Sequence, residues 1–339
     1  MKIVLIPVFD HYRDWIGKTY YDIITHFHKN SKHEIHLFWS DWRGVENIIK
    51  RIDPDLFVLF CTETIGFAKH FEYIFNMRGK VFACCLDIFH INRVRNCKYI
   101  KKCDGILHFS KQRRLLSSYK KIFPNKFIGC FRGRFVNTKK YKDYGYEKEY
   151  DILIYGSRGG KTPMGDHASD VQYKEKWEKH NKRDIPKEFS FYPLREKLEK
   201  LLSSLTKYRI KILPNKCIFN AHVANSDLSK LINKSYLTMA TGGRPDIAFS
   251  KYFEIGASYS GILGNIPEDY RDLFENNIVE VTEWMSDKEI LDIIDGALAD
   301  KKKLFEMTQR MGRRIHGEYD LKACVKDMDH VFDKIFKKD

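Results

Sequence analysis

Short apolar runs alternate with amphipathic stretches along the first part of the chain. The runs are five to seven residues long and rich in β-branched and aromatic residues, which is typical of β-strands. Several are continuously apolar, as expected for strands that helices cover on both faces. They are KIVLIPV, EIHLFW, DLFVLFC, KVFACCL, GILHF and KFIGCF. Helical periodicity at residues 19–28, 45–51, 64–77 and 111–121 completes the pattern of a doubly wound parallel sheet.

A second alternation follows a polar, basic stretch without periodicity at residues 132–150, which we interpret as an interdomain linker. Its apolar runs are DILIYG, YRIKIL, YLTMAT, GILGN and NIVEV. Helical patterns cover residues 193–205, 228–234 and 250–258, and three more lie between residues 287 and 337. The pattern predicts an α/β protein of two Rossmann-like domains that face each other across a cleft.

The expected domain boundaries follow from this alternation. Residues 1–140 form the first domain, residues 141–320 the second, and residues 321–339 a C-terminal helix that we expect to pack back on the first domain. A length of 339 residues agrees with two domains of about 150 residues each. The charged insertion at residues 158–186 is predicted to be a mobile loop or a short helix.

The turn at the start of the second domain resembles a phosphate-binding P-loop. A P-loop requires four residues between its first glycine and the Gly-Lys-Thr triplet, followed by a helix. Here only three residues separate Gly156 from Gly160, and Thr162 is followed by Pro163. The spacing therefore disfavours a P-loop, although a P-loop-like kinase remains an alternative.

The bulk composition narrows the class of protein. No run of about 18 apolar residues exists, so no membrane-spanning helix is predicted. The N-terminal apolar run is interrupted by charges and reads as a first strand rather than a signal peptide, so we expect a cytoplasmic protein. The eight cysteines include no C-x-x-C pair and the histidines form no cluster, so neither a metal site nor a cofactor is expected.

Positive charge is concentrated in one segment. Residues 92–142 contain 16 Lys or Arg and a single acid, Asp104, which accounts for the whole formal charge of +15. Such a segment can be a solvated basic face. It can also attract an anionic membrane surface, a nucleic acid or a phosphorylated ligand.

The densest constellation of chemical groups is ATGGRPDIAFSKYFEIGASYSG at residues 240–261. Gly243 allows a close backbone approach after a strand, while Arg244 and Lys251 supply positive charge. Asp246 and Glu254 are carboxylates with seven residues between them. Cations suit the phosphates of a nucleoside diphosphate and a carboxylate suits ribose hydroxyls. The alternative is a surface salt bridge between Lys251 and Glu254, one helical turn apart.

Residues 150–336 resemble the donor-binding domain of GT-B glycosyltransferases, particularly the "glycosyl transferases group 1" and spore-maturation CgeB-like branches. The spacing of Asp246 and Glu254 is similar to the E-x7-E motif, and KYFE at residues 251–254 is similar to the K-x-F-E of the CgeB-like branch. YDILIYGS, YPLREKL and LSKLINKSYL match the surrounding pattern in order. The chain departs from the motif by having Asp at the first carboxylate position.

The resemblance implies a hexosyl- or pentosyltransferase that moves a sugar from a nucleotide sugar to a hydroxyl of a glycan or glycolipid, without a metal. It implies that Glu254 holds the ribose, that Arg244 and Lys251 neutralise the diphosphate, and that Asp246 faces the transferred sugar. The first loop of the domain and the K-x-F-E segment would complete the donor site. These further residues are Gly156, Ser157, Arg158, Lys161, Gly243 and Tyr252.

An inverting enzyme also needs a general base from the first domain. Asp87 and His90 directly follow a predicted strand and are the first candidates. Asp10 and His11 follow the first strand and come next, and Gly17 is a further site candidate. A structural role for each of these side chains is the alternative.

Two other functions remain open. The basic segment could belong to a nucleic-acid-binding protein or to a glycosyltransferase that modifies DNA, although no helix-turn-helix or zinc-finger pattern is present. In a glycosyltransferase, the same segment could hold the protein peripherally at an anionic membrane or bind another polyanion.

Overall fold

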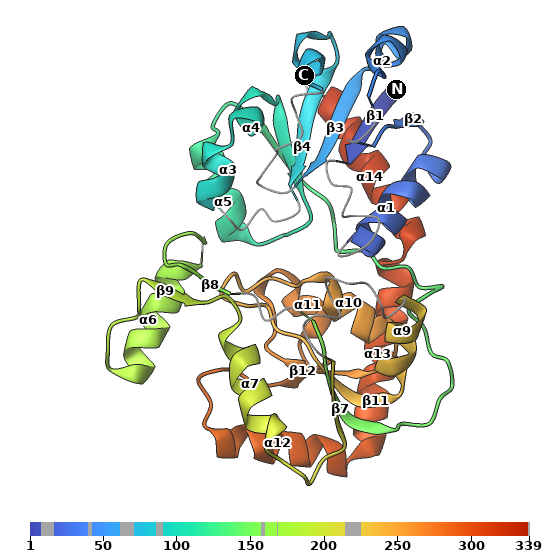
Figure 1. The fold of residues 1–339 in the computed structure, drawn as a ribbon. Helices are drawn as coiled ribbons and strands as arrows, with labels where there is room; N and C mark the ends of the chain where they lie inside the picture. Colours follow the sequence, from blue (N-terminus) through green and yellow to red (C-terminus); the bar gives the residue numbers. More distant parts are fainter. Residues whose placement is uncertain are drawn as a thin grey trace. The chain divides into compact units, whose positions relative to one another are not determined.

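The protein divides into two compact units in the computed structural model (Figure 1). The structure describes residues 1–7, 17–39, 43–61, 71–85, 91–156, 160–167, 169–213 and 225–337. Unit 1 contains Met1–Gly133, Asp166–Ala168 and Leu321–Asp339. Unit 2 contains Arg134–Gly165 and Ser169–Asp320. The division falls within the basic stretch that the sequence indicates as a linker.

Unit 1 is built on a sheet of six parallel strands in the order β2-β1-β3-β4-β5-β6. Their apolar side chains are buried on both faces of the sheet, and Ile3, Val4, Leu5 and Ile6 are all 0% exposed. Each of the six strands lies within one of the predicted apolar runs. The strands are β1 Lys2–Pro7, β2 Glu34–Leu37, β3 Leu56–Cys61, β4 Lys80–Cys85, β5 Gly105–His108 and β6 Phe127–Cys130.

Helices cover both faces of this sheet (Figure 1). Of the helix predicted at residues 64–77, the described part is the short 3-10 helix η3, Glu72–Asn76. The remaining helices of unit 1 are α1 Gly17–Asn30, α2 Glu46–Ile52, α3 Ile91–Asn96, α4 Lys98–Lys102, α5 Arg113–Ile122 and α14 Leu321–Phe336.

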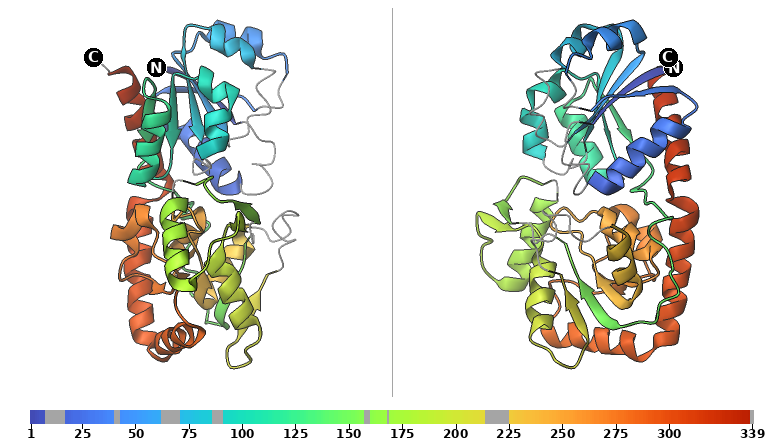
Figure 2. Two further views of the ribbon diagram at one scale, coloured as in Figure 1. Left: turned by 90° about the vertical axis from the view of Figure 1, so that its left-hand side faces the viewer. Right: turned by 45° about the vertical axis from the view of Figure 1, so that its right-hand side comes forward.

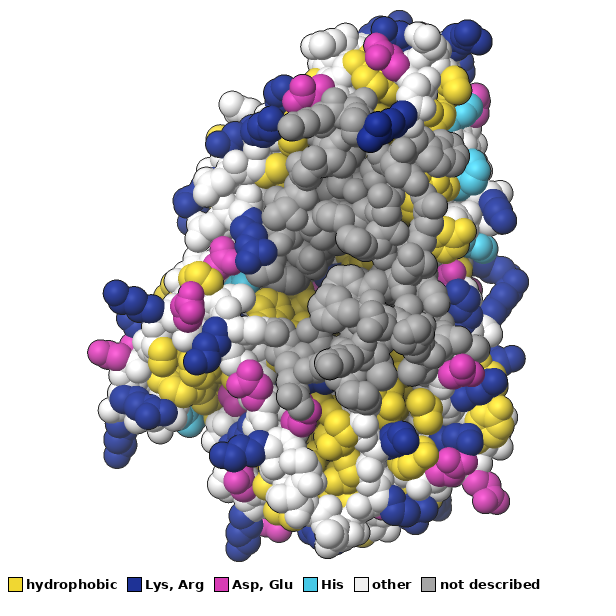
Figure 3. All heavy atoms as spheres, in the orientation of Figure 1, with side chains coloured by type: hydrophobic (Ala, Val, Ile, Leu, Met, Phe, Trp, Pro, Cys, Tyr) yellow, Lys and Arg dark blue, Asp and Glu magenta, His cyan; other side chains and the backbone are white. Residues whose placement is uncertain are grey.

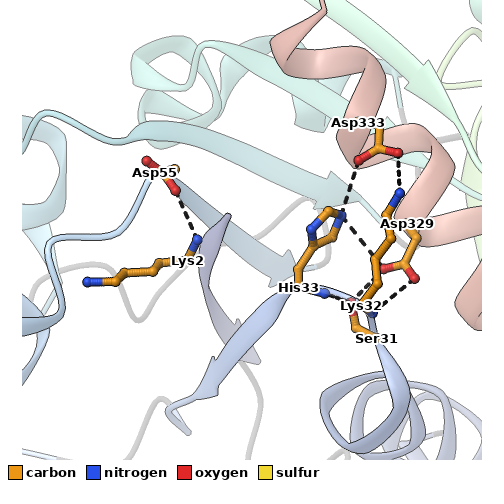
Figure 4. A network of polar contacts seen from close by, with 7 residues as sticks. All are labelled: Lys2, Ser31, Lys32, His33, Asp55, Asp329 and Asp333. Atoms are coloured by element: carbon orange, nitrogen blue, oxygen red, sulfur yellow. Dashed lines mark hydrogen bonds and ion pairs between the residues drawn. The ribbon is translucent and has the colours of Figure 1, made fainter.

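The C-terminal helix α14 packs along α1 within unit 1 (Figure 2). The rings of Phe27 and Phe332 meet edge to face at 5.5 Å between centroids, and both side chains are fully buried. Polar contacts at one end fix the register of the two helices (Figure 4): Ser31 Oγ donates to Asp329 at 2.5 Å, and His33 Nε2 lies 3.4 Å from Asp333. Burial of the aromatic rings supplies the larger part of the stabilisation.

Unit 2 is built on a second parallel sheet, of five strands in the order β10-β7-β11-β12-β13. The strand that comes first in the chain, β7, lies between the second and the third, so the direction in which strands are added reverses there. The strands are β7 Tyr150–Ile154, β10 Ile210–Ile212, β11 Ser235–Met239, β12 Gly261–Gly264 and β13 Val279–Glu280. The predicted pair of Rossmann-like α/β sheets is therefore present.

The helices of unit 2 follow the predicted order. Ser286 caps α12 with its side chain, in a capping box with Glu289. Leu194, Leu198 and Leu202 form the buried stripe of α7. The helices are α7 Pro193–Ser203, α9 Asn225–Asn233, α10 Ser250–Ala257, η4 Glu268–Tyr270, α11 Arg271–Phe274, α12 Asp287–Ala299 and α13 Lys301–Glu318.

The charged insertion has more regular structure than predicted. Strand β8, Lys161–Pro163, pairs antiparallel with β9, Glu188–Ser190, and the 12-residue helix α6, Asp170–Asn181, lies between them. Aromatic contacts attach the helix to the rest of unit 2: the rings of Trp177 and Phe189 lie 4.5 Å apart, and Tyr173 lies 5.3 Å from Trp284. These partners are distant in sequence, so local periodicity could not reveal them.

Candidate functional site

The candidate site lies at the point of unit 2 where the strand order reverses. In open α/β sheets, ligands bind beyond the carboxyl ends of the two strands at such a switch point. Here these strands are β7, which continues into Tyr155 and Gly156, and β11, which continues into Ala240 and Gly243. The equivalent point of unit 1 is between β1 and β3, whose following residues lie outside the described part of the chain.

Lys251, in the first turn of α10, reaches the end of β7. Its Nζ donates a hydrogen bond to the carbonyl oxygen of Tyr155 at 2.6 Å and lies 4.4 Å from the centroid of the Tyr155 ring. Gly156 has φ +103°, and a Cβ at this position would lie 2.3 Å from Lys251 Nζ. The backbone conformation therefore favours glycine here, and a Cβ would also displace the end of the Lys251 side chain. This brings together two predicted site residues that are far apart in sequence.

Arg195 is a second cation at the same place, and the sequence analysis missed it. Its Nη2 donates to the carbonyl oxygen of Gly156 at 2.6 Å, and its Nε lies 4.0 Å from Glu199. The residue is 4% exposed. The available signal was its position three residues before Leu198 and seven before Leu202, which puts a charged side chain on the apolar face of a predicted helix.

The protonation of this group of residues is perturbed by burial and by charge. Burial, and then the neighbouring Arg195, lower the pKa of Lys251 well below its usual value, while Glu254 acts in the opposite direction. Burial and the carboxylate of Glu254 raise the pKa of Tyr155 well above its usual value. Glu254 follows Lys251 by one turn of α10, so its carboxylate provides the negative charge near both groups.

The turn after β11 contains Asp246 and is held by Asn265. Gly243 and Asp246 have φ +61° and +53° respectively, and a Cβ on Gly243 would lie 2.8 Å from the Phe191 carbonyl oxygen. Asn265 accepts from the Gly242 N–H at 2.9 Å and donates to Asp246 Oδ1 at 3.3 Å. Asn265 follows β12 and was also missed; its position just after a strand was the only signal.

Tyr252 supports this turn rather than facing outward. It is fully buried, and its hydroxyl donates to the carbonyl oxygen of Asn265 at 2.9 Å. The side chain thus connects α10 to the end of β12, and with it the turn that contains Asp246.

The side chain of Arg244 is bound by other residues of unit 2. Its side chain is 0% exposed, its Nε lies 3.6 Å from Asp170 Oδ1, and its Nη2 donates to Pro163 O at 3.2 Å and to Thr162 Oγ1. Ser169 Oγ also donates to the Arg244 carbonyl oxygen at 2.5 Å. The guanidinium therefore attaches the β8–α6 insertion to the site turn, and its expected contact with a diphosphate stays a prediction.

The other predicted residues have different outcomes. Lys161 is exposed at the start of β8, so the strand replaces the helix that a P-loop would begin there. Gly17 is the first residue of α1. Ser157, Arg158 and the candidate bases Asp87, His90, Asp10 and His11 lie outside the described residues. Among the described residues, no group of three or more His, Cys, Asp or Glu could hold a metal ion.

Comparison with known proteins identifies the fold. No family model matches the chain, and no curated protein matches it in sequence. The structure is similar to sucrose-phosphate synthase from Thermosynechococcus elongatus, with a TM-score of 0.63, 9% identity and 99% of each chain covered. Anabaena HepE in complex with UDP and glucose has a TM-score of 0.60 and 11% identity, covering 98% of this chain and 100% of HepE.

A third similar structure is WaaG, a glycosyltransferase involved in lipopolysaccharide biosynthesis, with a TM-score of 0.53, 12% identity and all of both chains covered. At such low identities the likeness establishes the fold alone. The predicted GT-B fold, with two Rossmann-like α/β units, is thereby confirmed. The closer resemblance to the CgeB-like branch stays a prediction.

Proposed function

We propose that the protein is a glycosyltransferase that moves a sugar from a nucleoside diphosphate sugar to a hydroxyl acceptor. The observation that carries the proposal is the meeting of Lys251 and Arg195 at Gly156, at the switch point of the unit 2 sheet. A polyanionic ligand group is the partner that two adjacent buried cations favour. Glu254, one helical turn away, supplies an acceptor for ribose hydroxyls.

The chemistry requires stabilisation of the departing nucleoside diphosphate. In the transition state, negative charge develops on the oxygen that leaves the sugar, and fixed cations stabilise it without reorganisation. We assign this role to Lys251 and Arg195, and we place the transferred sugar on the side of Asp246. These two cations would take the place of a divalent metal, so we propose that chelators leave activity unchanged. A metal requirement for turnover would contradict this part.

Two features, one of a comparison structure and one of the sequence, support the choice of donor. HepE is similar in fold along the whole chain and has been solved with UDP and glucose. KYFE at residues 251–254 matches the pattern of the CgeB-like branch, which we keep as the finer assignment. We propose a glycan or glycolipid as the acceptor, and Asp87 or His90 as the base that deprotonates its hydroxyl.

A thermal-shift screen tests the donor site. UDP, GDP, ADP, CMP and dTDP sugars are added to the full chain, and one nucleotide class is expected to raise the melting temperature. A ligand at 100 times its Kd adds about 2.7 kcal/mol to the free energy of unfolding. Lys251→Met and Glu254→Gln should abolish the shift. Glu149→Gln is the matched control, because Glu149 pairs with Lys234 at 2.6 Å on the surface of the same unit.

Two results would contradict the proposed site. In one, no nucleotide raises the melting temperature of a protein that is otherwise folded. In the other, Glu254→Gln responds to the ligand as fully as Glu149→Gln does. The P-loop-like kinase is tested in the same samples, because it predicts ATP turnover that depends on Lys161. The strand at that position gives this alternative no structural support.

A specific observation in unit 1 bears on the partner. Helices α3, α4 and α5 contain no Asp or Glu, and Figure 3 shows Lys and Arg side chains over the side of the unit that they form. We name these exposed cations the basic helix surface. Its members are Arg93, Arg95, Lys98, Lys101, Lys102, Arg113, Arg114, Lys120 and Lys121. Among the described residues, no helix is long and apolar enough to span a bilayer.

We propose that the basic helix surface contacts an anionic membrane and so brings the enzyme peripherally to a lipid-linked acceptor. Each Lys or Arg near an anionic leaflet contributes about 1 kcal/mol. Co-sedimentation should therefore occur with phosphatidylserine vesicles and not with phosphatidylcholine vesicles. Replacing Lys101, Lys102, Lys120 and Lys121 with Gln should release the protein.

The matched control replaces the three consecutive lysines of α13, residues 301–303, which lie in unit 2. Tight binding to duplex DNA with a steep salt dependence, and none to vesicles, would favour the nucleic-acid alternative. Binding to neither leaves only a solvated face, which would refute the membrane proposal.

A further inference from the structure

Building on the proposed donor site, we infer that Arg195 rather than Arg244 is its second phosphate-binding cation. We infer further that Lys251 takes up a proton from solvent when a diphosphate binds beside Arg195. The inference deepens the proposed function, because it assigns the cations that bind the phosphates and the proton that Lys251 takes up on binding.

The two cationic groups are held close together by the backbone after β7. Lys251 donates to the Tyr155 carbonyl oxygen and Arg195 to the next one, of Gly156, each at 2.6 Å. A Cβ built on Gly156 would lie 2.3 Å from Lys251 Nζ and 3.1 Å from Arg195 Nη1. The two nitrogens are therefore no more than 5.4 Å apart, the sum of these distances. A phosphate group can contact both at once, and a diphosphate can span them.

Several groups act on the Lys251 amine. Arg195 acts on it from α7 and Glu254 from the same helix α10. The Tyr155 ring and carbonyl oxygen contact it just after β7. Burial and the adjacent guanidinium both favour the neutral amine and lower its pKa, while Glu254 acts in the opposite direction. Glu199 contacts Arg195, the other member of this pair, with its carboxylate 4.0 Å from Arg195 Nε. The empty site therefore favours a neutral Lys251 at a lower pH than an ordinary lysine would.

A bound diphosphate reverses this balance. Its negative charge offsets the repulsion from Arg195 and accepts a hydrogen bond from the ammonium form, so both effects raise the pKa of Lys251. At a pH at which the empty site is partly deprotonated, binding must then be coupled to proton uptake, by linkage. One proton passes from solvent to the Nζ, and no other bond forms or breaks.

Arg244 is instead bound by residues of the β8–α6 insertion, and a phosphate contact would have to replace those bonds. Its guanidinium is bound within the protein by Asp170, Pro163 and Thr162 and is 0% exposed. Arg195 also remains fully charged at every working pH, because a guanidinium does not deprotonate in proteins. The pair thus combines one permanent charge with one that depends on the ligand.

Isothermal titration calorimetry of the full chain with UDP, GDP, ADP and CDP provides the test. Titrations at pH 8.5 in Tris and in HEPES, which differ in ionisation enthalpy, give the number of protons taken up per nucleotide bound. Wild type should take up a measurable fraction of a proton, and Lys251→Arg should bind with a markedly smaller uptake. Arg195→Gln should weaken binding at least tenfold, and Arg195→Lys should weaken it by a smaller factor. The melting temperature of each variant without ligand, compared with that of wild type, checks that the variant is folded.

The outcomes separate this inference from the function on which it rests. Nucleotide binding without proton uptake in wild type, or equal uptake in Lys251→Arg, overturns the inference and leaves the donor site standing. Wild-type affinity in a folded Arg195→Gln also overturns it. If the wild type binds none of the four nucleotides, and no nucleotide of the thermal-shift screen raises its melting temperature, both the inference and the proposed donor site fail.

Discussion

Substituting Gly156 by Ala tests the geometry on which the candidate site depends. Gly156 has φ +103°, in a region that side chains rarely adopt, and a Cβ there would lie 2.3 Å from Lys251 Nζ. The left-handed backbone costs an alanine about 1–2 kcal/mol. Displacing Lys251 breaks its hydrogen bond to Tyr155, at a further cost of about 1–2 kcal/mol. We therefore expect Gly156→Ala to lower the free energy of unfolding by about 2–4 kcal/mol.

Gly160→Ala is the matched control in the same segment. Nothing lies within 4 Å of a Cβ at Gly160, and its φ is outside the left-handed region. An alanine at a compatible position stabilises by about 0.4–1 kcal/mol through the unfolded state. A P-loop would make the opposite prediction for function, because Gly160 would then precede the phosphate-binding lysine.

Urea unfolding followed by circular dichroism measures both variants, and the thermal-shift screen measures nucleotide binding. Gly156→Ala should lower the melting temperature by about 4–16 °C, at about 2–4 °C per kcal/mol for a unit of this size. It should also weaken nucleotide binding, while Gly160→Ala retains both properties. Equal stability and binding in the two variants would refute the placement of Lys251 against Gly156.

Two further predictions concern buried charges in unit 2. Arg244→Met should lower the free energy of unfolding by about 3–5 kcal/mol in urea, because Asp170 is left buried without its cation. Arg209→Met, which breaks a surface pair with Asp151, should cost less than about 1 kcal/mol, and equal losses would contradict the role of Arg244. Burial lowers the pKa of Lys148 to about 8, so the folded state binds fewer protons than the unfolded state between about pH 8 and pH 10.5. The free energy of unfolding of the wild type should therefore rise with pH across this window relative to that of Lys148→Met, by at most about 1.4 kcal/mol per pH unit. Chemical denaturation at several pH values measures both proteins, and parallel pH profiles would exclude this effect.

Much of the fold could be predicted from the chain because its strands are local patterns. Continuous apolar runs such as KIVLIPV and DILIYG are buried on both faces of a parallel sheet, and each is a strand in the structure. The sequence also indicates the segments that contain Gly156 and Lys251 as a candidate site, since both segments follow strands where parallel sheets bind ligands, and their ligand stays a prediction. Periodicity is a property of neighbouring residues, so a single sequence reveals it.

The charged insertion shows where this reasoning stops. Helix α6 has a weak apolar face in sequence, and it is held by rings that lie at distant positions, such as Phe189 and Trp284. Its helical structure therefore depends on packing partners that the local sequence does not contain. A prediction of a loop or short helix was the expected result of reading residues 158–186 by themselves.

The sequence by itself determined that two parallel sheets form and that a segment with two cations and two carboxylates follows the third strand of the second sheet. Only the tertiary structure decided which cations meet. Arg244 and Arg195 are equally charged in sequence, but β8 and α6 bind the first, and the buried face of α7 carries the second to Gly156. The physical reason is that charge is a property of one residue, whereas the neighbours that a charge meets depend on how separate elements pack.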